Sequence, residues 1–182
     1  MQHTLIALVE DKPGVLNRVA SLFRRRQFNI ESLTVGHTEQ PGISRMTIVI
    51  DSDQTSSERV TSYLHKLVNV IQVEDVSTRP VVTRDLAMIK VAVTNTNRTE
   101  IIQMVDVFRA RIVDVSNDSM IVEITGDEEK IDGFVDVLRP YGIIEMVRTG
   151  VVSMLRGAAT PSNGYYASHA NGNGKPAVKM FG

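Results

Sequence analysis

The chain contains 182 residues, and 42% of them are hydrophobic, which is enough to build the core of one large or two small domains. Its 20 basic and 21 acidic side chains nearly cancel, which argues against a general nucleic-acid binder. The absence of cysteine excludes disulfides, thiolate zinc sites and a cysteine nucleophile. No apolar run approaches the roughly 20 residues of a membrane span, and no signal-peptide pattern opens the chain. We therefore expect a cytoplasmic protein with no membrane contact.

The first informative element is the turn Glu-Asp-Lys-Pro-Gly at residues 10–14, which joins an apolar strand to a helix. Pro13 suits the first helical turn, where its missing N–H costs nothing. Gly14 has no Cβ, so another molecule can approach the backbone closely. The free N–H groups at the start of the helix favour a carboxylate. A plain structural turn and an anion site are both consistent with this pattern.

The predicted strands and helices follow one order in the first half of the chain and repeat it in the second half. Apolar periodicity gives strand, helix, strand, strand, helix, strand, which is the split βαβ or ferredoxin-like arrangement. The second half repeats this order with little identity and a shorter central hairpin. We therefore predict an α+β fold with two ferredoxin-like βαββαβ domains in tandem. The expected strands are 4–9, 28–35, 43–51, 70–73, 86–93, 112–115, 120–125 and 143–147, and the expected helices are 14–26, 55–68, 101–108 and 127–138.

Changes in composition set the predicted boundaries. We assign residues 1–77 to the first domain, 78–83 to a linker and 84–157 to the second domain. Residues 158–182 are rich in Gly, Asn, Ala and Ser, without periodicity, and are interpreted as a flexible tail. Residues 94–99 of the second half replace the Asp-Lys-Pro-Gly turn of the first. A ligand held at the first turn should therefore have no equivalent site in the second domain.

Residues typical of catalysis or metal binding are scattered along the chain. The four histidines, at positions 3, 37, 65 and 169, show no metal-ligand spacing. The sequence has no G-x-S-x-G elbow, Walker loop or dinucleotide fingerprint. Three arginines at 24–26 form either a solvated helix end or a docking patch for an acidic partner. We predict no catalytic residues and no metal site, and a protein that binds a ligand and acts on a partner.

Several segments carry a resemblance to a known family. The run Leu-Val-Glu-Asp-Lys-Pro-Gly-Val-Leu-Asn-Arg-Val-Ala at 8–20 resembles the opening of an ACT domain. The run Phe-Asn-Ile-Glu-Ser-Leu-Thr-Val-Gly at 28–36 is more specific. Together with segments at 44–49, 64–70, 84–91 and 148–152, it resembles the small, regulatory subunit of acetohydroxyacid (acetolactate) synthase. The resemblance covers about residues 1–157, which is nearly everything before the tail.

The resemblance implies a regulatory function. In that family the catalytic, or large, subunit uses thiamine diphosphate, magnesium and FAD to condense pyruvate with a second 2-keto acid, which begins branched-chain amino-acid biosynthesis. The small subunit raises that activity and confers feedback inhibition, usually by valine. We therefore expect no cofactor on this chain, a catalytic large subunit as partner, and valine or another branched-chain amino acid as the allosteric effector. Related ACT domains pair side by side, which implies a homodimer with the effector at the pair interface.

The resemblance also implies a set of site residues. The backbone around Gly14 should hold the ligand carboxylate, and Asn29 of the neighbouring chain should hydrogen-bond the ligand. Val15 and Leu16 either line the side-chain pocket or belong to the core. The residues assigned to effector binding are Asp11, Pro13, Gly14, Val15, Leu16, Asn29 and Ile30. A second group, expected to influence the effector response, comprises Asn17, Thr34, Val35 and Gly36.

Two residues depart from the family pattern, which commonly has Asn at position 11 and Gly at position 27. A carboxylate at Asp11 repels the ligand's carboxylate and attracts its ammonium. Gln27 is strained in the left-handed turn that Gly would adopt. Valine, leucine and isoleucine differ too little for the sequence to choose among them. A stand-alone ACT-domain sensor is the alternative, and an RNA-binding module of the same element order would need exposed aromatic side chains that the equivalent strands lack.

Overall fold

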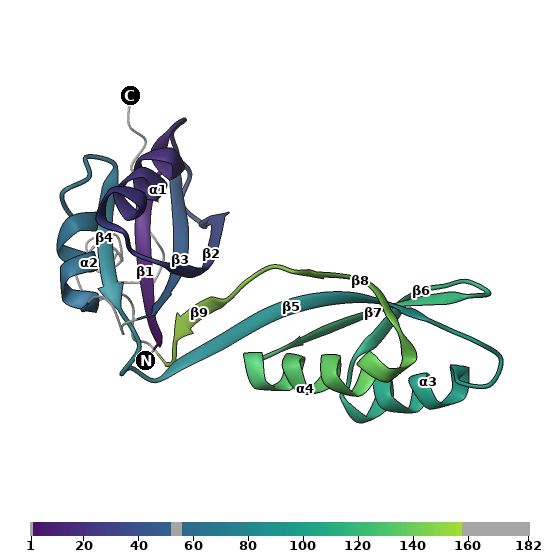
Figure 1. The fold of residues 1–182 in the computed structure, drawn as a ribbon. Coiled ribbons are helices and arrows are strands. Elements are labelled where there is room, and N and C mark those ends of the chain that lie inside the picture. Colours follow the sequence, from purple (N-terminus) through teal and green to yellow (C-terminus); the bar gives the residue numbers. More distant parts are fainter. Residues whose placement is uncertain (1, 52–55, 158–182) are drawn as a thin grey trace. The chain divides into compact units, whose positions relative to one another are not determined.

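The computed structural model describes residues 2–51 and 56–157, so the predicted tail at 158–182 lies outside the described residues. Its contacts divide the chain into two compact units. One is formed by residues 2–51, 56–82 and 153–157, and the other by Thr83–Val152. Each unit has a sheet with two helices over one face (Figure 1). The predicted α+β fold of two ferredoxin-like domains in tandem is confirmed.

The first unit is built on a four-stranded antiparallel sheet. Side chains alternate along its central strand, so Leu5, Ala7 and Val9 join the core that the helices cover. Val19 and Phe23 of the first helix complete this core, and each such buried side chain contributes about 1.5–3 kcal/mol. The strand order is β2-β3-β1-β4. The elements are β1 (Gln2–Glu10), α1 (Val15–Arg26), β2 (Ile30–His37), β3 (Ile43–Asp51), α2 (Ser57–Leu64) and β4 (Val70–Asp75).

Helix α1 ends in the left-handed turn that we considered at Gln27, which has φ 56° and ψ 36°. The N–H of Gln27 donates to the carbonyl of Arg24 (3.2 Å), and the N–H of Phe28 donates to that of Phe23 (3.0 Å). These two bonds define a Schellman motif. The rings of Phe23 and Phe28 pack edge to face, with centroids 5.9 Å apart. The apolar contact holds the turn although its backbone conformation costs a non-glycine residue about 1–2 kcal/mol.

The second unit repeats the design with the strand order β6-β7-β5-β8. Asp127 caps its second helix, because its Oδ1 accepts from the N–H of Lys130 at 3.0 Å. Its first helix is followed by a second left-handed non-glycine residue, Arg109, with φ 54°. The elements are β5 (Val81–Ala92), α3 (Arg98–Val107), β6 (Arg111–Val115), β7 (Ser119–Gly126), α4 (Glu128–Leu138), a 3-10 turn (Arg139–Tyr141) and β8 (Ile143–Arg148).

A ninth strand, β9 (Val152–Leu155), was not predicted, because the repeated element order was already complete before it. It follows Gly150, whose φ is 85°, and pairs with β5. Leu155 belongs to a small core cluster with Ile6, Val76 and Val81. The carbonyl of Ser153 accepts from Arg45 Nη2 at 2.6 Å. Residues 153–157 therefore contribute to the first unit, whereas the sequence analysis had grouped them with the second domain.

Candidate functional site

The turn before α1 is a type II β-turn over residues 12–15. The N–H of Val15 donates to the carbonyl of Lys12 at 3.3 Å, and Gly14 has the φ of 84° and ψ of −4° that this turn requires at its third position. Pro13 occupies the second position of the turn, so its predicted place in the first helical turn was wrong, since α1 begins at Val15. A Cβ built on Gly14 would have no atom within 4 Å, so the backbone here is open to an approaching ligand.

Helix α1 begins without a side-chain cap. The N–H of Val15 is used by the turn, and that of Arg18 donates to the Gly14 carbonyl at 3.0 Å. Between them, Leu16 and Asn17 supply N–H groups that have no intrahelical acceptor. Val15 is 4% exposed and belongs to the core, whereas Leu16 is 48% exposed. The helix start can therefore hold an anion, with Leu16 as the accessible apolar group beside it.

A buried asparagine ties this turn to the rest of the first unit. Asn69 donates through Nδ2 to Glu10 Oε2 at 2.6 Å, and its Oδ1 accepts from Arg18 Nη1. Its carbonyl accepts from the Glu10 N–H at 2.9 Å. The hydrogen bonds from Asn69 and then from Lys12 lower the pKa of Glu10. Asn69 was not predicted as a site residue, because its partners lie 51 and 59 residues away along the chain.

Asp11 is anchored through its backbone and paired through its side chain. Its N–H donates to the carbonyl of Gly42 at 2.8 Å, and its Oδ2 lies 3.3 Å from Nδ1 of His37. Asp11 was predicted as a site residue, whereas His37 was not. Both β1 and β2 run antiparallel to β3, so their carboxyl ends lie at the same end of the sheet. The predicted strand order alone could have indicated that these two residues are neighbours.

The remaining predicted residues follow β2, which is an edge strand of the sheet. Asn29 precedes the strand, which begins two residues later than predicted, and its Nδ2 donates to Glu31 Oε1. Ile30 is aligned through β3 with the start of β1, whereas Gly36 is aligned with its end. Asn29 and Ile30 therefore lie at the opposite end of the sheet from the first turn. A single chain does not bring the two halves of the predicted site together.

The far half of β2 carries the second group of predicted residues. Val35 is 42% exposed, Gly36 is exposed and Thr34 is half-buried. An edge strand of this kind offers its backbone to another strand. Residues at this end of β2 therefore lie between the first turn of their own chain and whatever strand pairs with the edge.

The equivalent junction of the second unit is built differently. The N–H of Thr94 donates to Oδ1 of Asn97 at 2.7 Å, so the asparagine closes the loop on itself. None of the described residues with positive φ falls in this loop. The open backbone of the first turn is therefore not repeated here. Within residues 2–51 and 56–157, no group of three or more His, Cys, Asp or Glu side chains is arranged to hold a metal ion.

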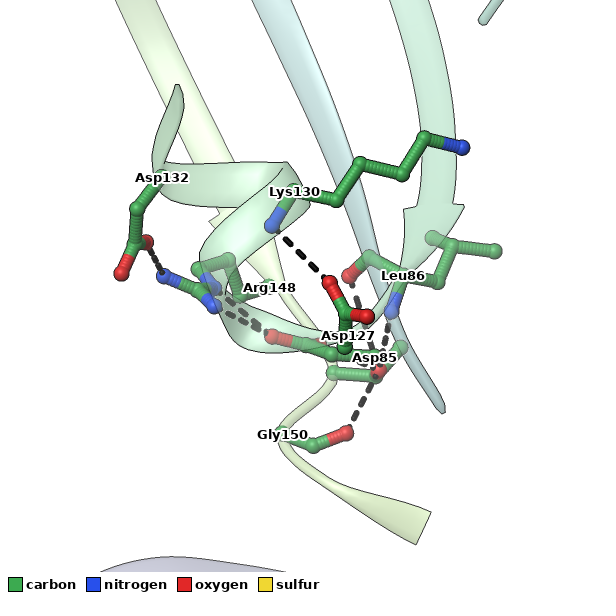
Figure 2. Close-up of polar contacts among 8 residues, drawn as sticks. Asp85, Leu86, Asp127, Lys130, Asp132, Arg148 and Gly150 are labelled. Carbon is green, nitrogen blue, oxygen red and sulfur yellow. Dashed lines mark hydrogen bonds and ion pairs between the residues drawn. The ribbon is translucent and has the colours of Figure 1, made fainter. Parts of the chain in front are cut away.

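Two of the recognised sequence segments converge in the second unit on a buried carboxylate (Figure 2). Asp85, whose side chain is 3% exposed, accepts from Arg148 Nε at 2.8 Å and lies 2.7 Å from its Nη2. Arg148 Nη1 reaches Asp132 of α4 at 2.7 Å, and the Thr149 hydroxyl lies 3.1 Å from the other oxygen of Asp85. Burial alone would lower the pKa of Arg148, but its bonds to Asp85 and Asp132 raise it. This cluster, defined by Asp85, Asp132, Arg148 and Thr149, joins β5 and α4 to the end of β8.

Comparison with known proteins identifies the family. The profile of the AHAS small subunit-like ACT domain matches residues 5–72, and that of the small subunit of acetolactate synthase matches residues 84–157. The probable acetolactate synthase small subunit of Archaeoglobus fulgidus is 54% identical over 157 residues, which cover 86% of this chain and 98% of that protein. The chain belongs to the acetolactate synthase small-subunit family. This confirms the predicted family and its small-subunit class.

Other small subunits of acetolactate synthase agree. That of Mycolicibacterium smegmatis is 52% identical over 155 residues, which cover 85% of this chain and 91% of that protein. The crystal structure of the Thermotoga maritima small subunit has a TM-score of 0.81 and 40% identity, and covers 87% of this chain and 99% of that one. The likeness to small subunits thus extends over both units. In the part of the chain that the structure describes, no helix is long and apolar enough to span a membrane.

Proposed function

We propose that this small subunit activates a catalytic acetolactate synthase subunit and confers feedback inhibition by valine, which binds between two copies of the first unit. The observation that carries the proposal is the first turn, where an open Gly14 backbone lies beside two N–H donors of an uncapped helix. Family membership supplies the catalytic partner. That partner would carry the thiamine diphosphate, magnesium and FAD of the reaction, while this chain would carry none.

A second copy would complete the site. In an antiparallel pairing of two β2 strands about a two-fold axis, the Ile30 end of one strand lies beside the His37 end of the other. Asn29 of the neighbouring copy then approaches the turn that contains Asp11 and Gly14. Within one chain these residues lie at opposite ends of the sheet. Such a homodimer would bring them together, because each half of the site would come from a different copy.

The proposed effector fits the chemistry of this arrangement. Its carboxylate would accept from the N–H groups of Leu16 and Asn17, a position that the helix dipole favours by about 0.3–1 kcal/mol. Its branched side chain would contact the exposed groups of Leu16 and Val35. The amide of Asn29 from the neighbouring copy would hydrogen-bond the ligand. Leucine and isoleucine are the natural competitors, because one methylene in an apolar pocket changes the binding free energy by about 1–3 kcal/mol.

Inhibition would follow from a shift between two arrangements of the paired units. The effector must prefer one arrangement, and the catalytic subunit must bind the two unequally, because an effector without differential affinity shifts nothing. The coupling free energy of such systems is about 1–3 kcal/mol, which changes an affinity about 5- to 150-fold. The same coupling requires that the catalytic subunit alter the affinity for valine by an equal factor.

The test is calorimetric titration of the purified chain with valine, leucine and isoleucine, followed by inhibition of the reconstituted holoenzyme. Gly14→Asp should abolish binding and inhibition, because its carboxylate fills the open approach. Gly157→Asp is the matched control, since Gly157 also has a positive φ of 69° and open space around its Cβ direction. Unchanged valine inhibition in Gly14→Asp would contradict the site. Effector binding without any change in the catalytic subunit's activity would favour the stand-alone sensor instead.

A further inference from the structure

We propose that His37 is an effector-site residue of this chain, which compensates the charge of Asp11 so that the site accepts the carboxylate of an amino acid. The inference rests on the proposed function and names the group that tunes its affinity. Its starting point is the contact between Asp11 Oδ2 and His37 Nδ1, at 3.3 Å, which is an ion pair when the histidine is protonated.

Asp11 poses an electrostatic problem for the proposed site. Its carboxylate lies three residues before Gly14, and its backbone is held by the bond from its N–H to the carbonyl of Gly42 at 2.8 Å. A ligand carboxylate on the N–H groups of Leu16 and Asn17 would therefore bring a second negative charge to the same turn. Two like charges within a few ångströms disfavour the ionised pair, so an uncompensated Asp11 should weaken the site.

The Lys and Arg side chains near the turn have partners of their own. Lys12 Nζ lies 3.0 Å from Glu10, and Arg18 donates to Asn69. Among the residues that the structure describes, His37 is the basic side chain that contacts Asp11. It reaches Asp11 because the ends of β1 and β2 lie at the same end of the sheet. The compensation of Asp11 therefore depends on His37.

The proposed dimer would strengthen this interaction. In one chain the His37 side chain is 83% exposed and that of Asp11 is 46% exposed, so water weakens their attraction. Antiparallel pairing of β2 brings Asn29 of the neighbouring copy beside His37, because the strand has His37 at one end and Ile30 at the other. The histidine then lies between the first turn of its own chain and the neighbour's contribution to the site. Exclusion of water there strengthens the contact between His37 and Asp11.

A double-mutant cycle tests the proposal, with valine affinity measured by titration of the full chain and by inhibition of the holoenzyme. His37→Gln should weaken valine binding about three- to fivefold, the upper range of an exposed ion pair. In an Asp11→Asn background the same change should have less than about a twofold effect, because no carboxylate remains to compensate. His65→Gln, at an exposed histidine after α2, is the control and should bind valine like the wild type.

Each other outcome overturns the proposal. Unchanged or tighter binding in His37→Gln would mean that Asp11 serves the ligand's ammonium and that His37 competes with it. An equal loss in both backgrounds would mean that His37 acts without Asp11. If the wild-type holoenzyme responds to no branched-chain amino acid, the proposed function itself fails. If the wild type responds and His37→Gln responds equally, only the proposal for His37 fails.

Discussion

Replacing Arg148 with Met should destabilise the second unit by about 3 kcal/mol. The guanidinium makes two contacts of 2.8 and 2.7 Å to one oxygen of Asp85, whose side chain is 3% exposed. Removing one member of a buried ion pair costs about 3–5 kcal/mol, because the other charge stays buried without compensation. The Arg148 side chain is 27% exposed, so water can enter beside it and the loss should fall near the lower limit. Thr149 alone cannot neutralise the remaining carboxylate.

The free energy of unfolding should be measured by urea denaturation followed by far-ultraviolet circular dichroism, because the chain has no tryptophan. Two units require a fit with two transitions, and the loss should fall on one of them. Arg139→Met is the matched control. Its ion pair with Asp136 is 70% and 73% exposed, so its loss should cost less than about 0.5 kcal/mol.

A companion variant separates the buried-charge argument from simple loss of contacts. Asp85→Leu combined with Arg148→Met leaves no charge unpaired, so it should recover most of the stability that Arg148→Met loses. The reasoning is refuted if Arg148→Met costs no more than Arg139→Met. It is also refuted if the double variant is less stable than Arg148→Met, because the buried carboxylate would then not be the source of the loss.

Three further predictions concern the first unit. Gln27→Gly should stabilise the chain by about 0.5–1 kcal/mol in the same denaturation assay, because it relieves a left-handed backbone at φ 56°, whereas Arg24→Gly within α1 should destabilise it by about 1 kcal/mol. Burial opposes ionisation of Asp75, but hydrogen bonds from Ser57, Ser77 and His3 lower its pKa below the ordinary 3.8. The wild type should therefore be more stable than Asp75→Asn at neutral pH, and this difference should vanish as pH falls through that lowered pKa. Equal differences at pH 7 and in strong acid would contradict this. Val35→Lys should convert a dimer to a monomer in sedimentation velocity, while Val113→Lys, on the exposed edge strand β6, should not.

Local sequence patterns predicted the helices and strands well, because each kind of element has its own short-range periodicity of apolar residues. The predicted strands lie within two residues of the described ones at both ends, apart from β5, which begins five residues earlier than predicted. The turn chemistry of Gly14 was recognised, but its type was not, since the choice between a helical first turn and a type II turn depends on the bond from Val15 to Lys12. The left-handed turn at Gln27 was likewise considered from the sequence, but the contact between the Phe23 and Phe28 rings that holds it as a Schellman motif was not.

Contacts between residues far apart in the chain could not be predicted in this way. Asn69 bridges Glu10 and Arg18, and Arg148 reaches Asp85 across 63 residues. Neither pairing leaves a local signal, because any exposed turn or strand end carries similar polar residues. β9 was missed for a related reason, since a four-residue strand is recognised by the partner that it pairs with and not by its own pattern. The sequence therefore identified the segments, whereas their assembly into a site depends on long-range pairing that the sequence did not predict.

The division of the candidate site between the two ends of β2 has a thermodynamic consequence. A ligand that binds only the paired form stabilises the pair by RT ln(1 + [L]/Kd) for each site, which is about 2.7 kcal/mol at a ligand concentration 100 times Kd. Two sites related by a two-fold axis would contribute twice. By reciprocity, any change that weakens the β2 edge must also weaken effector binding. Val35→Lys should therefore raise the valine concentration needed for inhibition, whereas Gly14→Asp should remove inhibition without dissociating the pair.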